Sequence, residues 1–155
     1  MNQLSVSLLP GCVFRPAKVE DIWEIRKLVL GAKLEPTQLR WQQFRTIEYQ
    51  GKIVACGQLR SFLGVQELGS LVVAPAWRGK GLATYLTRHL IEEATQPLYL
   101  ECMSGLVPFY RRFGFVEVPW KSLPQPLKIK FALGQVASKL LPVRFAVMQY
   151  QGISK

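Results

Sequence analysis

The segment from Leu71 to Thr84 holds the residues whose types and spacing point most directly to chemistry. An apolar stretch, Leu71-Val72-Val73, is followed after four residues by Arg78-Gly79-Lys80-Gly81-Leu82-Ala83-Thr84. Glycines let a chain turn its N–H groups toward a ligand, and a helix N-terminus carries about half a positive charge. Arg78 and Lys80 each add a full charge. These features predict a main-chain cradle for a phosphate or pyrophosphate group where a helix begins.

Two other phosphate-binding patterns are excluded by the same residues. Gly79, Gly81 and Thr84 nearly match a dinucleotide fingerprint, and Glu101 lies about 20 residues further on, where an acid that binds ribose is expected. However, Thr84 replaces the third glycine, Pro75 lies between the strand and the loop, and an alternating βαβ pattern is absent. A P-loop also fails, because no Gly-Lys-Ser/Thr triplet occurs. The remaining alternative is a helix start that merely needs glycine.

Hydrophobic periodicity indicates which elements must position this cradle. Leu82, Leu86 and Leu90 recur every four residues, which predicts an amphipathic helix that begins near Gly81. Strands are predicted at 13–15, 45–49, 53–62, 65–73, 98–103, 115–118 and 143–150, and further helices from about 19, at 34–42, 106–113 and 127–140. This order predicts one α+β domain over residues 1–155, with a mixed, mostly antiparallel central sheet flanked by helices.

Two details of the predicted helices concern single side chains. In the helix at 106–113, Leu106, Phe109 and Phe113 are expected to form the core stripe. His89 is placed on the polar face of the long helix, where we expect it to be solvated.

Composition bounds the classes of protein to which the chain can belong. It has 155 residues, of which 49% are apolar and 19% charged, which is typical of a compact domain. No apolar run approaches the roughly 20 residues that span a bilayer, and the N-terminus lacks a secretory leader pattern. Cys12, Cys56 and Cys102 lie far apart, without metal-ligand spacing to a histidine. We expect a cytoplasmic, reduced and metal-free protein that does not insert in a membrane.

The net charge of +10 points to an anionic partner. Twenty basic residues stand against ten acidic ones, and beyond Glu117 there are six basic residues and no acidic one. Nucleic acid therefore stays open as a partner, as does a phosphorylated cofactor. It is not favoured, because the basic residues do not alternate with aromatic side chains and no nucleic-acid-binding motif is present. A solvated basic surface is the simpler interpretation.

Two sequence blocks resemble the GNAT superfamily of acyl-CoA-dependent N-acyltransferases. The first is Arg78-Gly79-Lys80-Gly81-Leu82-Ala83, which is similar to the family's Arg/Gln-x-x-Gly-x-Gly/Ala motif and follows a strand as it does there. The second is Pro108-Phe109-Tyr110-Arg111-Arg112-Phe113-Gly114-Phe115, which resembles the family's Phe-Tyr-x-x-x-Gly-Phe block. Their order and spacing agree with the family over Val65 to Val118, about half of the chain.

The resemblance implies a co-substrate and the residues that hold it. Acetyl-CoA is expected, with its pantetheine arm along the backbone of Leu71, Val72 and Val73 and its pyrophosphate on the N–H groups of residues 78–84. Members commonly carry an asparagine seven residues before the motif tyrosine, where this chain has Met103. Ser104 is expected to take over this contact with the pantetheine or the acceptor.

The transfer of an acetyl group to an amine needs a base for the ammonium and a proton for the departing thiolate. Tyr110 is the expected acid, with a core tyrosine as the alternative. Glu67 matches the base position of histone-type members, and Glu101 that of members that acetylate N-termini of ribosomal proteins. A glutamate in an apolar strand is costly unless it is paired or hydrated, so both are candidates, with Glu101 slightly preferred. Salt bridges are the alternative for both.

The acceptor is not determined by the sequence. By resemblance, its groove lies between residues 31–41 and 119–142, segments that contain Trp41, Trp120 and several lysines. We expect a primary amine of a small molecule or protein as acceptor, and a monomer or homodimer. Two other functions stay open: a sensor that binds acetyl-CoA without turnover, and a basic module associated with RNA or ribosomes.

Overall fold

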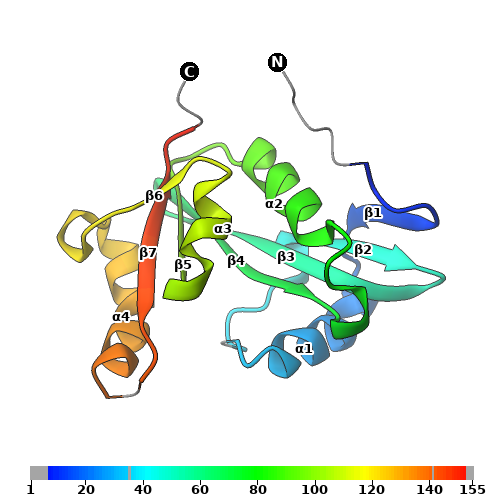
Figure 1. Ribbon diagram of the computed structural model, residues 1–155, viewed down its shortest axis with the longest axis horizontal. Helices are drawn as coiled ribbons and strands as arrows, with labels where there is room; N and C mark the ends of the chain where they lie inside the picture. Colours follow the sequence, from blue (N-terminus) through cyan, green and yellow to red (C-terminus); the bar gives the residue numbers. More distant parts are fainter. Residues whose placement is uncertain (1–6, 35, 141, 153–155) are drawn as a thin grey trace. The chain divides into compact units, whose positions relative to one another are not determined.

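The computed structural model describes residues 7–34, 36–140 and 142–152 (Figure 1). The described strands are β1 Cys12–Pro16, β2 Phe44–Tyr49, β3 Lys52–Phe62, β4 Val65–Val73, β5 Leu98–Met103, β6 Phe115–Glu117 and β7 Phe145–Tyr150. The described α-helices are α1 Ile22–Gly31, α2 Leu82–Glu93, α3 Val107–Arg111 and α4 Gln125–Leu140.

The strands form one mixed sheet in the order β1-β2-β3-β4-β5-β7-β6. β1 with β2, β2 with β3, β5 with β7 and β6 with β7 pair antiparallel, whereas β4 and β5 pair parallel. The predicted α+β fold with a mostly antiparallel sheet and flanking helices is therefore confirmed.

The chain divides into two compact units. The first comprises residues 1–60 and 68–93, and the second comprises 61–67 and 94–155, so β4 contributes to both. The predicted single domain over residues 1–155 stays a prediction.

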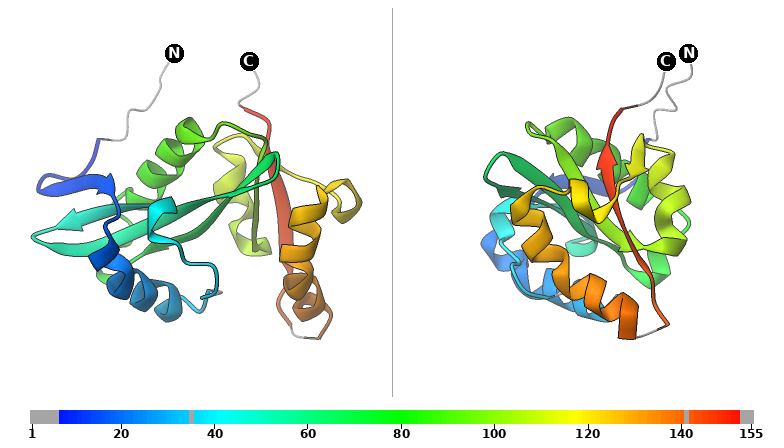
Figure 2. Two further views of the ribbon diagram at one scale, coloured as in Figure 1. Left: turned by 180° about the vertical axis from the view of Figure 1, so that it is seen from behind. Right: turned by 90° about the vertical axis from the view of Figure 1, so that its left-hand side faces the viewer.

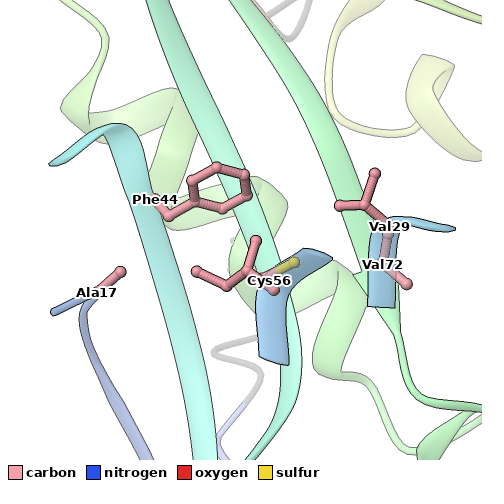
Figure 3. Packing of buried hydrophobic residues seen from close by; sticks show 6 residues of the cluster. Ala17, Val29, Phe44, Cys56 and Val72 are labelled. Carbon is pink, nitrogen blue, oxygen red and sulfur yellow. The ribbon is translucent and has the colours of Figure 1, made fainter. Parts of the chain in front are cut away.

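In the first unit, α1 and α2 cover opposite faces of the strands (Figures 1 and 2). Beneath α1, Ile25 and Val29 are one turn apart and pack with Ala17, Phe44, Cys56 and Val72, as Figure 3 shows for five of these residues. On the other face, Leu82 and Leu86 of α2 pack on Ile47, Val54 and Ala55. The buried leucine stripe predicted for α2 is thus confirmed, and it anchors the start of the helix on the sheet.

In the second unit, α4 packs on β5 and β7. Leu127 and Phe131, again one turn apart, form a buried cluster with Tyr99 of β5 and Val147 of β7. The short helix α3 contributes Tyr110, whose ring meets that of Phe115 of β6 edge-on at 5.9 Å between centroids. In this unit, α4 therefore lies against the part of the sheet that contains β5 and the start of β4, the strands that carry Glu101 and Glu67.

Three expectations drawn from the sequence were wrong. The helix at 34–42 is absent from the described part of that segment, where the only helical turn is the 3-10 turn Trp41–Gln43. Leu106 is 46% exposed and Val107 and Tyr110 are buried instead, because a 3-10 turn over Ser104–Leu106 shifts the start of α3. His89 is half-buried, and its ring stacks with those of Phe14 and Tyr85, at 4.6 and 4.3 Å between centroids.

Candidate functional site

The predicted anion cradle begins where β4 ends in the first unit. Gly79 and Gly81 have φ angles of 77° and 84°, in the left-handed region that glycine adopts without strain. The first helical hydrogen bond of α2 runs from Tyr85 N to Gly81 O at 3.0 Å. N–H groups in the first turn of a helix have no acceptor inside it. The main chain from Gly81 to Thr84 therefore has the geometry that an anion needs.

Charge and anchoring support this interpretation. Arg78 and Lys80 are exposed, and the guanidinium Nε of Arg78 donates to the carbonyl of Val73 at 3.2 Å. This bond ties the cation to the last residue of β4. Leu82 is only 2% exposed and fixes the helix start in the core. Positive charge and unsatisfied N–H groups thus meet at one rigid turn, which fits a pyrophosphate.

The other residues predicted to contact acetyl-CoA lie in β4, in the first turn of α2 and after β5. In β4, Val72 is buried toward α1, and Leu71 and Val73 pack toward α2. Ala83 and Thr84 are half-buried in the first turn of α2. Ser104 belongs to the second unit, where it is exposed and its N–H donates to the carbonyl of Arg144 at 2.9 Å.

An unusual backbone conformation inside β4, just before these residues, was not predicted. Ser70 has a φ of 49°, which is uncommon for a residue with a side chain. Its hydroxyl accepts a hydrogen bond from Arg60 Nη2 at 2.9 Å and donates to Gln58 Oε1 at 3.3 Å. The pair Gly69-Ser70 inside an apolar strand was the available signal, because glycine within a strand often marks a bulge.

The two candidate glutamates both belong to the second unit. β4 and β5 pair at Glu67 with Tyr99, and Glu101 follows Tyr99 by two residues, on the same face of the strand. Glu67 is 3% exposed, and its carboxylate lies 3.1 Å from Lys130 Nζ of α4. The lysine side chain is itself 14% exposed. Glu67 is therefore held in a nearly buried ion pair.

Glu101 differs from Glu67 in its hydrogen bonding. Its Oε2 atom is buried and lacks a hydrogen-bond partner among the residues that the structure describes. Burial raises the pKa of Glu101 to about 7, the positive charge of Lys130 opposes this rise, and the negative charge of Glu67 adds to it. A carboxyl group with a pKa near neutrality can take and release protons under ordinary conditions.

Tyr110 lies on the other side of β5 from Glu101. Side chains alternate along the strand, and Cys102, next to Glu101, is the β5 residue whose charge acts on Tyr110. Tyr110 is 7% exposed, with Phe109 edge-on to its ring at 5.0 Å. Burial, with a smaller contribution from Cys102, raises the pKa of the phenol well above its usual range. The hydroxyl therefore stays protonated as a donor.

Lys130 is the residue at this cluster that sequence reasoning missed. The stripe of Leu127 and Phe131 predicts the buried face of α4, and Lys130 precedes Phe131 at the edge of that face. Nothing in the sequence distinguishes it from Lys128, two residues earlier. Its partner could be found only by placing α4 on the sheet.

Comparison with known proteins identifies the family. A model of the Acetyltransferase (GNAT) family matches residues 13–115, more than half of the chain. The chain belongs to the GNAT family. The resemblance of the two motif blocks to this family is thereby confirmed. A search of curated proteins found no match.

Solved structures share the GNAT fold with this chain. N-acetylglutamate synthase from Neisseria gonorrhoeae, complexed with coenzyme A and L-arginine, has 20% identity and a TM-score of 0.71; the match covers 91% of this chain and 34% of the synthase. Rv2747 from Mycobacterium tuberculosis, in complex with CoA, has 20% identity and a TM-score of 0.70, with 92% and 99% covered.

An acyl-CoA N-acyltransferase from Pseudomonas aeruginosa is also similar, with 16% identity, a TM-score of 0.61, and coverage of 90% of this chain and 97% of that one. The GNAT chain described here spans about a third of the length of the synthase. Across the described residues, it has no helix that is both long and apolar enough to cross a membrane.

Proposed function

We propose that this GNAT chain is an N-acetyltransferase that moves an acetyl group from acetyl-CoA to a primary amine by direct attack in a ternary complex. The observation that carries the proposal is Glu101, a carboxyl group with a pKa of about 7 and a buried oxygen that has no hydrogen-bond partner among the described residues. Such a group is suited to the base that this reaction requires.

The cradle of the first unit supports acetyl-CoA as the co-substrate. The N–H groups of Gly81 to Thr84 and the cations Arg78 and Lys80 would hold its pyrophosphate. The backbone of Leu71 to Val73 would pair with the pantetheine arm, and Ser104 would contact the arm or the acceptor. When bound, acetyl-CoA supplies an acyl group activated as a thioester.

Glu101 would act on the acceptor. An amine attacks a thioester only when it is neutral, whereas a free alkylammonium has a pKa of about 10 and carries a proton at pH 7. The ionised carboxylate of Glu101 would take this proton first, which frees the nitrogen lone pair to attack the acyl carbon. The negative charges of Glu67 and Glu101, which Lys130 offsets in part, would also favour a cationic acceptor at this cluster.

Tyr110 would serve the leaving group. When the carbon–sulfur bond breaks, the thiolate needs a proton or a strong hydrogen bond. A phenol whose pKa lies far above that of a thiol, about 8.5, donates a hydrogen bond readily but gives up its proton less easily. We therefore propose that Tyr110 first stabilises the departing sulfur by a hydrogen bond, and that the thiolate then takes up one proton while the nitrogen releases one as the amide forms.

An acceptor screen tests this proposal. The purified chain is given acetyl-CoA and a panel of primary amines, amino acids and peptides, and thiol release is measured together with the mass of the acetylated product. We expect release that depends on an amine and is strongly reduced in Glu101→Gln. Binding of acetyl-CoA without release for any amine would instead support a sensor. RNA binding that weakens steeply with salt, without release, would support a basic RNA-binding module.

A further inference from the structure

We propose that Lys130 of α4 is a positioning residue of the candidate site: by holding Glu67 in an ion pair, it leaves Glu101 as the carboxylate that receives the acceptor's proton. The inference rests on the proposed function, because it assigns the division of labour between two glutamates that both matched base positions. It also gives α4 a role in the chemistry, beyond its packing on the sheet.

The geometry of the ion pair carries this inference. Lys130 Nζ lies 3.1 Å from the Glu67 carboxylate, and the two side chains are 14% and 4% exposed. The chain around Lys130 is fixed, because Leu127 and Phe131, on either side of it, are 0% and 1% exposed. The ammonium also lies 5.5 Å from the centre of the Phe131 ring. Lys130 is thus a cation held in place by the core.

The side chains that surround Glu101 come from β4, α4, β5 and β7. β4 brings Glu67, which opposes ionisation of Glu101, and α4 brings Lys130, which favours it. On β5 itself, Cys102 faces the opposite side, and β7 places the apolar Val147 across from Glu101. Lys130 is therefore a cation whose charge acts on Glu101 as well as on its ion-pair partner Glu67.

Removal of the ammonium should therefore move the titration of Glu101 to higher pH. An opposite charge at this range lowers the pKa of a carboxyl group by about one to three units. In Lys130→Met, we expect the acid limb of the pH–rate profile to rise by about one unit or more, so that activity at pH 7 falls several-fold and recovers at higher pH. A purely structural ion pair would lower stability without moving that limb.

Four variants test the role of Lys130. Lys130→Arg keeps the charge and should keep the limb. Lys130→Met combined with Glu67→Gln removes the cation and the repelling carboxylate together, so the limb should return toward its original position. This double variant also avoids an unpaired buried charge, which protects the fold if Lys130→Met alone unfolds. The control is Lys128→Met, since side chains two residues apart on a helix point about 200° apart.

Two readouts separate this inference from the proposed function. The carboxyl carbon chemical shift of Glu101, followed against pH by NMR in protein without acetyl-CoA, reports its titration whether or not the chain turns over. The pH–rate profile of acetyl transfer reports the acid limb. Movement of both in Lys130→Met, but in neither Lys128→Met nor Lys130→Arg, is the expected result.

An unmoved NMR titration in folded Lys130→Met would overturn the inference and leave the acetyltransferase proposal intact. The same holds if the limb moves equally in Lys128→Met. A shifted titration in a chain that acetylates no amine would instead refute the proposed function, while Lys130 would still set the charge state of the pair.

Discussion

At the scale of single residues, Glu101 links stability to function. Its pKa is raised from an ordinary value of 4.5 to about 7, so the folded state binds its proton more tightly than the unfolded state does. The stability that this proton contributes is complete below about pH 4.5 and is lost as the pH rises through 7. Above pH 7, the protein carries a buried charge at a cost of about 2 to 3 kcal/mol.

Glu101→Gln should therefore stabilise the protein at pH 8 and change it little at pH 5. The expected gain at pH 8 is about 1 to 3 kcal/mol in the free energy of unfolding, measured by urea denaturation at both pH values. Glu117→Gln is the control, because Glu117 is an exposed carboxylate on β6. Equal stability of the wild type and Glu101→Gln at pH 8 would contradict the raised pKa of Glu101.

Tyr110→Phe should lower the single-turnover rate and leave acetyl-CoA affinity nearly unchanged. The ring packing with Phe109 and Phe115 survives, and only the hydroxyl is lost. We expect a loss of about 10² to 10⁴ in rate if the hydroxyl assists the leaving sulfur. The control is Tyr150→Phe, in the same aromatic group at 5.4 Å from Phe115. A full rate in folded Tyr110→Phe would remove Tyr110 from the mechanism.

From the sequence alone, the residues that could be predicted are those whose burial costs free energy. Glu67 and Glu101 could be found because an ionisable side chain in an apolar strand demands a reason. The difference between the two, an ion pair for Glu67 and a buried oxygen without a hydrogen bond for Glu101, could not be predicted. It depends on Lys130, which is 63 residues away from Glu67 in the sequence. His89 was misplaced for a similar reason: its partner Phe14 comes from β1, far away in the sequence.

At the scale of elements, the turn from β4 into α2 leads to a prediction about cofactor binding. Gly81→Val should abolish measurable acetyl-CoA binding in a folded protein. A branched side chain resists a φ of 84°, and it would stand beside the N–H groups of the first turn. Calorimetric titration measures the affinity.

The matched control for Gly81→Val is Gly51→Val in the hairpin between β2 and β3. Gly51 has a φ of 80°, so valine suffers the same backbone strain there, away from the cradle. Both variants should lose stability, by about 1 to 3 kcal/mol, but only Gly81→Val should lose affinity. Unchanged affinity in folded Gly81→Val would end the assignment of the cradle.

Elements with a strong period were predictable, and those without one were not. The four-residue stripe of α2 and the apolar strands β4 and β5 follow directly from local sequence. The segment at 34–42 has no such stripe, and Gln38 adopts a φ of 61°, which no helix accommodates. The left-handed backbone conformation of Ser70 was likewise missed, because a single residue changes conformation inside an otherwise regular strand.

At the scale of the whole molecule, ligand specificity separates the GNAT interpretation from the dinucleotide pattern. Coenzyme A at about 100 times its dissociation constant should raise the free energy of unfolding by about 2.7 kcal/mol, and Tm by about 5 to 10 °C. NAD at the same concentration should leave Tm unchanged. Thermal melts with each ligand measure this, and Gly81→Val should lose the response to coenzyme A. Stabilisation by NAD alone would revive the dinucleotide hypothesis.

The central claim is that Glu101 is the base of an acetyl transfer, and the pH dependence of the single-turnover rate tests it most directly. With saturating acetyl-CoA and an acceptor found in the screen, the wild-type rate should rise with pH, reach half its plateau near pH 7 and level off above it. In Glu101→Gln, the rate should be lower, and the limb near pH 7 should vanish. The same limb retained in Glu101→Gln, at an undiminished rate, would contradict this account.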